Sequence, residues 1–180
     1  MIQNYPDCVK EMGTAYEVKK AVESGEIYRI EKGVYADTPE ISTLAIITTK
    51  YPNGIITMDT AFYYHNLTDV IPDYYYIATR SSARGIRDKR VKQVFIKEEF
   101  LNQGVMTMKR RDAEFRIYDR ERMLIELMRF KSKLPYDYYK EILNNYRGLL
   151  YELDVERIQK YASTFPKSKM LTDILDREVF

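Results

Sequence analysis

The chain has 180 residues, of which 45% are hydrophobic and 13% aromatic, and its formal net charge is +2. This composition excludes a disordered chain and is typical of a soluble protein with one ordinary domain or two small ones. Its apolar runs are far shorter than the roughly 20 residues of a membrane helix, so we expect no membrane partner. The single cysteine, Cys8, excludes an intramolecular disulfide, and we expect a cytoplasmic protein with Cys8 as a small buried residue.

Charge is distributed unevenly along the chain. Residues 1–37 hold five Lys or Arg against seven Asp or Glu, and residues 38–79 hold one against four. Residues 80–131 hold fifteen against eight, whereas residues 132–180 are balanced. Phosphate contacts supply most of the non-specific affinity for nucleic acid, so a nucleic-acid hypothesis must account for a basic excess in the middle of the chain.

The first 37 residues have the pattern of a helix-turn-helix followed by a hairpin. "YPDCVKEMG" predicts a short helix that begins at Pro6 and ends at Gly13. A second helix of about eleven residues follows, with Thr14 as its N-cap and Gly25 as its stop. "EIYRI" and "GVYA" then alternate around a turn at Gly33, which predicts a β-hairpin where a winged helix has its wing.

The remaining residues, 38–180, predict a mixture of strands and helices. A helix is expected with Thr38 as its cap and an end near Tyr51, then a short strand through Ile55 and Ile56 and a helix capped near Thr57. "YYYIAT", "VKQVFI", "GVMTM" and "EFRIY" predict a small sheet, and four helices follow Tyr118, the first of them capped by Asp119. The expected fold class is α+β, with a winged helix-turn-helix over residues 1–37 and an α+β domain over residues 38–180.

Two groups of residues are candidates for binding. A recognition helix and a wing would present side chains to DNA bases and phosphates, and the candidates in those positions are Thr14, Tyr16, Lys19, Lys20, Arg29 and Lys32. The basic middle of the chain could bind DNA phosphates or an acidic protein surface, and its candidates are Arg80, Arg84, Arg87, Lys89, Arg90, Lys92, Lys109, Arg110 and Arg111. For both groups the alternative is an ordinary solvated surface.

Enzymatic interpretations find little support in the sequence. His65 is the only histidine, which excludes a His-based metal site, and it fits a structural residue at a helix end better than a catalytic one. No Gly-rich phosphate loop or dinucleotide fingerprint is visible. We therefore expect no catalytic residue, metal or cofactor.

Taken in order, "IYRIEKGVYA", a helix opened by "PE", "PNGIITMDTAFYYHNL" and "YDRERMLIELMRFK" resemble the AbiEi family of antitoxins, from type IV toxin–antitoxin systems of abortive infection. The resemblance spans nearly the whole chain, although family members usually have another helix before Tyr5. It implies a winged helix-turn-helix that binds inverted repeats in the protein's own promoter, and a C-terminal domain that antagonises a nucleotidyltransferase-like toxin without a stable complex. Two alternatives stay open: a protein-interaction module whose helix-turn-helix no longer reads DNA, and an enzyme acting on nucleic acid or nucleotides.

Overall fold

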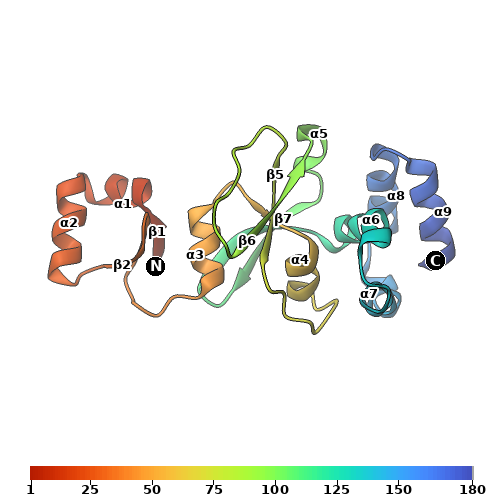
Figure 1. Ribbon diagram of the computed structural model, residues 1–180, viewed down its shortest axis with the longest axis horizontal. Helices are drawn as coiled ribbons and strands as arrows, with labels where there is room; N and C mark the ends of the chain where they lie inside the picture. The colour runs from red at the N-terminus through yellow and green to blue at the C-terminus, as the bar shows by residue number, and fades with distance from the viewer. Residues whose placement is uncertain (180) are drawn as a thin grey trace. The chain divides into compact units, whose positions relative to one another are not determined.

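The structure, a computed structural model, describes residues 1–179 and has the expected mixed α+β fold (Figure 1). The chain divides into two compact units. The first consists of residues 1–54 and 107–115, and the second of the other described residues, 55–106 and 116–179. The domain boundary expected after residue 37 therefore lies inside the first unit, between a strand and a helix.

The first unit begins with a short strand and two helices, and its first three strands form a small antiparallel sheet. Its elements are β1 (Ile2–Asn4), α1 (Tyr5–Met12), α2 (Ala15–Ser24), β2 (Tyr28–Glu31), β3 (Val34–Ala36) and α3 (Thr43–Lys50). The strand order is β1-β3-β2, so that β3 lies between two antiparallel partners. Gly13 separates the two helices with a φ of 93°, a value that favours glycine. The buried side chains of α2 are those of Val18 and Ala21.

Two features of this unit differ from the sequence prediction. Strand β1 was not expected at all. The helix predicted from Thr38 begins only at Thr43, because the side chain of Ser42 caps it by accepting a hydrogen bond from the Ala45 amide. The backbone amide of Ser42 is in turn held by the Asp112 carboxylate at 2.7 Å, a contact across 70 residues.

The larger sheet has the strand order β6-β5-β4-β8-β7. It consists of β4 (Ile55–Ile56), β5 (Tyr75–Arg80), β6 (Val91–Ile96), β7 (Val105–Arg110) and β8 (Ala113–Tyr118). The last four are the strands expected from period-two runs. Strand β5 is antiparallel to β4 but parallel to β6, so the segment 81–90 must return to the starting end of β5 before β6 begins.

Helices complete the second unit. They are α4 (Met58–Tyr64), the short and unexpected α5 (Glu98–Leu101), α6 (Arg120–Phe130), α7 (Tyr136–Gly148), α8 (Val155–Thr164) and α9 (Ser168–Glu178), with single 3-10 turns at Lys131–Lys133 and Leu150–Glu152. Helix α6 is the centre of this group, since every residue from 121 to 128 is buried. Asp119 is its N-cap as predicted, accepting a hydrogen bond from the Arg122 amide at 2.7 Å.

Candidate nucleic-acid interface

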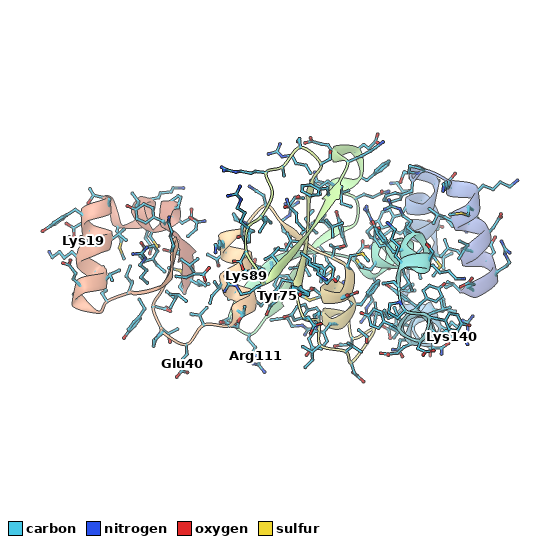
Figure 2. All side chains as sticks on the ribbon, in the orientation of Figure 1. Lys19, Glu40, Tyr75, Lys89, Arg111 and Lys140 are labelled. Atoms are coloured by element: carbon cyan, nitrogen blue, oxygen red, sulfur yellow. The ribbon has the colours of Figure 1, made fainter. Side chains whose placement is uncertain are left out.

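Helix α2 presents the candidate recognition residues on an exposed face. Thr14 caps the helix, and its hydroxyl oxygen accepts a hydrogen bond from the Glu17 amide at 3.1 Å. Tyr16 is 71% exposed, and Lys19 extends from the same helix (Figure 2). The N-terminus of α2, with its capped amides, therefore carries a large exposed aromatic ring and two nearby cations.

The positive charge of this face is partly balanced on the helix itself. The ammonium group of Lys19 lies 3.6 Å from the carboxylate of Glu23, one turn further on. Lys20 lines a shallow hollow of about 250 Å³ together with Glu17 and Glu26. Exposed pairs of this kind contribute little to stability, but they reduce the attraction of the helix for phosphate.

The hairpin of β2 and β3 carries the other two candidates of this unit. Arg29 is exposed opposite Tyr35, and Lys32 is exposed at the turn, next to Gly33 with a φ of 84°. Behind the turn, Glu31 pairs with Lys50 of α3 at 3.0 Å. The hairpin thus keeps one cation at its tip and one on its strand, where a wing would contact a DNA backbone.

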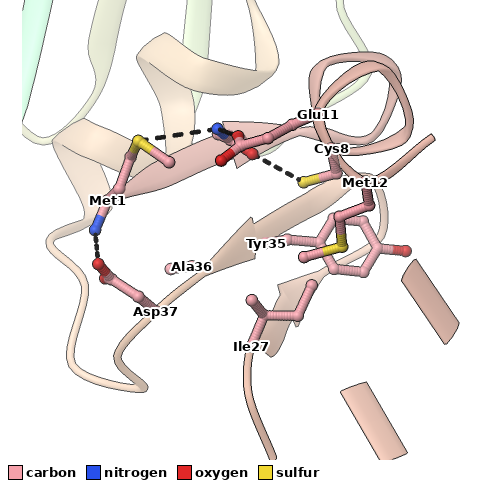
Figure 3. A pocket seen from close by; sticks show the side chains of 9 residues that line it. Met1, Cys8, Glu11, Met12, Ile27, Tyr35, Ala36 and Asp37 are labelled. Atoms are coloured by element: carbon pink, nitrogen blue, oxygen red, sulfur yellow. Dashed lines mark hydrogen bonds and ion pairs between the residues drawn. The ribbon is translucent and has the colours of Figure 1, made fainter. Parts of the chain in front are cut away.

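The first unit also contains a small apolar pocket of about 80 Å³, shown in Figure 3. Cys8 lies in it, and its thiol donates to the side-chain oxygen of Gln3 at 3.3 Å. Burial raises the pKa of the Cys8 thiol, and nearby carboxylates raise it further. Cys8 is therefore a buried, protonated thiol, and its burial was expected from the sequence.

The first basic segment covers residues 80–92, and its cations are of two kinds: some are exposed without an ion pair to a described residue, and others have a partner in the chain. Four are exposed and form no ion pair within residues 1–179: Arg80, Arg84, Arg87 and Lys89. Arg90 instead forms a two-pronged pair with Asp88, at 2.9 and 2.7 Å. Lys92 lies over the ring of Tyr74, 4.1 Å from its centroid.

The segment is also held to the sheet. The side chain of Gln93 donates to the Thr79 hydroxyl at 2.8 Å and to the Arg84 carbonyl at 3.2 Å, and its oxygen accepts from the Ile86 amide at 2.7 Å. A single glutamine thus fixes the middle of this segment. Its exposed cations consequently project from an ordered backbone.

The second basic segment is the turn between β7 and β8. Lys109 is exposed and pairs with Glu114 at 2.8 Å, while Arg111 has a positive φ of 48° at the tip. Arg110 is exposed as well. This turn belongs to the first unit, whereas residues 80–92 belong to the second. The two basic segments are thus parts of different units.

Two groups of residues in the second unit escaped the sequence analysis. The first is the buried pair of Arg122 and Glu126 in α6. The second is Asp59 at the start of α4, which interacts with the hydroxyl groups of Tyr76 and Tyr138. The spacing of Arg122 and Glu126 permits an ion pair on a helix but does not indicate its burial, and the partners of Asp59 come from distant parts of the chain. His65, by contrast, is structural as expected: it is buried, ends α4, and forms a 2.6 Å hydrogen bond with the Tyr118 carbonyl.

Comparisons with known proteins identify no relative: no protein-family model matches the chain, and no curated protein matches it. Within residues 1–179, no group of three or more His, Cys, Asp or Glu side chains is placed to hold a metal ion. In the same part of the chain, no helix is both long enough and apolar enough to cross a membrane.

Proposed function

We propose that this protein is a cytoplasmic antitoxin that binds its own promoter DNA through residues 1–37 and antagonises a nucleotidyltransferase-like toxin. One observation carries the DNA-binding part of the proposal. Helices α1 and α2 lie between β1 and β2, and the sheet has the order β1-β3-β2. This is the order of elements in a winged helix-turn-helix, in which the second helix reads DNA and the hairpin is the wing.

The side chains of α2 are consistent with that role. Its exposed face carries Tyr16, Lys19 and Lys20 near a capped N-terminus, where backbone amides and the helix dipole favour phosphate. Lys32 at the hairpin turn adds a cation in the position of a wing contact. The resemblance to AbiEi antitoxins in "IYRIEKGVYA" and in the later motifs supports both the promoter and the toxin as partners.

A second function is favoured by a different observation. Glu23 pairs with Lys19, and Glu17 and Glu26 lie around Lys20, so α2 offers DNA little net positive charge. A protein-interaction module that has kept the helix-turn-helix only as a scaffold would have these properties. In that case the exposed cations Arg80, Arg84, Arg87 and Lys89 would contact a protein surface.

The two functions are separated by measuring binding of the purified chain to a duplex from directly upstream of its gene and to a scrambled duplex, each at two salt concentrations. The regulator should prefer the upstream duplex and lose affinity steeply with salt, because binding releases counterions from phosphates. Equal, weak affinity for both duplexes would reject the regulator and favour the interaction module.

A further inference from the structure

A pocket of about 190 Å³ lies in the second unit, between the start of α4 and the segment leading into α7. Its apolar part comes mainly from Val70, Ile71 and Leu134, together with the ring of Tyr138. Two carboxylates, Asp59 and Asp73, also line it. No Lys or Arg of the described chain is among its lining residues. The Asp59 pocket therefore combines apolar walls with two carboxylates and has no cation in its lining.

Asp59 lies near polar groups from two other elements of the second unit. The hydroxyl groups of Tyr76 in β5 and Tyr138 in α7 interact with its carboxyl group and lower its pKa. A cation that acts on Asp59 is Lys92, whose ammonium group lies 3.4 Å from the Tyr76 hydroxyl and 4.1 Å from the ring centroid of Tyr74. Lys92 lowers the pKa of the Asp59 carboxyl group but is not one of the residues that line the pocket.

The residues at the rim of the pocket indicate what kind of molecule could bind its carboxylates. Ile71 is 74% exposed and its neighbour Val70 is 52% exposed, which leaves two adjacent aliphatic side chains in solvent beside the pocket. Single exposed apolar residues are common on protein surfaces, but an adjacent pair bordering a carboxylate-lined pocket is a feature of interaction sites. Asp69 and Asp137 are exposed and each is next in sequence to a residue that lines the pocket. Their negative charge disfavours nucleic acid and favours a basic protein segment.

We propose that the Asp59 pocket binds a lysine or arginine side chain of a partner protein, while apolar neighbours of that residue pack on Val70 and Ile71. The cation would meet the Asp59 carboxylate between apolar walls, where a charge-assisted hydrogen bond is stronger than in water. The aliphatic pair would supply buried apolar area around it, as in an interface hot spot. This binding is independent of DNA recognition by α2.

The test uses the intact protein and a random dodecapeptide display library. Selection on the wild-type chain should enrich peptides with Lys or Arg flanked by apolar residues. The best peptide, synthesised with a fluorescent label, should bind Asp59→Asn and Ile71→Ser at least 10-fold more weakly, as expected for loss of a buried ion pair or of its apolar cover. Tyr151→Ser, at an 89% exposed position outside the pocket, should bind the peptide like the wild type.

Ile71→Ser changes only an exposed side chain, so its peptide affinity tests the proposal even if Asp59→Asn does not fold. Failure to enrich any peptide, enrichment of peptides without a cation, or unchanged affinity of Ile71→Ser would overturn the proposal. The Lys19→Ala/Lys20→Ala double variant should bind the peptide normally, so loss of promoter binding and loss of peptide binding are distinguishable.

Discussion

Arg122 and Glu126, one turn apart in α6, form an ion pair inside the second unit, with 2.7 Å between Nη2 and Oε1 and both side chains buried. The guanidinium also donates to the carbonyls of Phe100 and Gln103, at 2.9 and 3.2 Å. It lies 4.4 Å from the ring centroid of Phe165 in the segment after α8. One arginine therefore joins α6 to the chain before β7 and to the C-terminal helices.

Removing the charge of Glu126 should destabilise the protein strongly. The Glu126→Gln variant leaves Arg122 buried without its counterion, and breaking buried pairs in this way costs about 3–5 kcal/mol of the free energy of unfolding. The comparison is Glu23→Gln, which breaks the exposed pair with Lys19 and should cost less than about 1 kcal/mol. Urea unfolding of both variants measures the difference, and similar losses would contradict a structural role for the buried pair.

Gly104 should not tolerate a side chain. Its φ is 76°, and a Cβ atom there would lie 2.6 Å from the Cβ of Arg122. Gly33 has a comparable φ of 84° but open space around it, so its alanine variant isolates the backbone strain, about 1–2 kcal/mol. We expect Gly104→Ala to lower the thermal midpoint clearly more than Gly33→Ala. Equal shifts would mean that the chain before α6 moves aside without cost.

The elements of the fold could largely be predicted from local patterns, whereas their long-range contacts could not. Capping residues and period-two runs located α2, β6 and the N-cap Asp119 correctly. The predicted start of α3 at Thr38 was wrong, because the N-cap is Ser42, whose backbone amide is held by the carboxylate of Asp112, far away in the sequence. Charge counting also overstated the basic surface of residues 80–131, since Arg122 is buried and Arg90 is paired within the segment.

The candidate site was predictable only as a set of residues. Lys19 and Lys20, which were candidates on the expected recognition helix, are both exposed on α2. Helical spacing could not indicate that Glu23 would pair with Lys19, because the geometry of two flexible side chains is not fixed by spacing alone. The Asp59 pocket had no sequence signature, since residues 59, 71, 134 and 138 meet only in the folded chain.

Asp59 should make stability depend on pH in a defined direction. Burial raises the pKa of its carboxyl group above the ordinary value of 3.8, and the nearby Tyr76 and Tyr138 hydroxyl groups and the charge of Lys92 offset this only in part. As the pH falls through the raised pKa, the folded chain takes up a proton before the unfolded chain does, so this group adds stability on acidification. Above that pKa the added stability is lost.

The measurement is the difference in unfolding free energy between wild type and Asp59→Asn at several pH values from 7 to 4. The amide side chain of the variant cannot titrate, so the difference should shift in favour of the wild type as the pH falls. A difference that is constant with pH, or that shifts in favour of the variant, would contradict the raised pKa.

The central claim is that α2 recognises DNA, and it is tested most directly by titrating the upstream duplex with the wild type and the Lys19→Ala/Lys20→Ala variant in parallel. Both lysines are exposed, so circular dichroism should show an unchanged fold. The account predicts a wild-type preference for the upstream over a scrambled duplex and roughly a 10-fold or greater loss in the variant, with a shallower salt dependence. Unchanged affinity in the variant would contradict the assignment of α2 as the recognition helix.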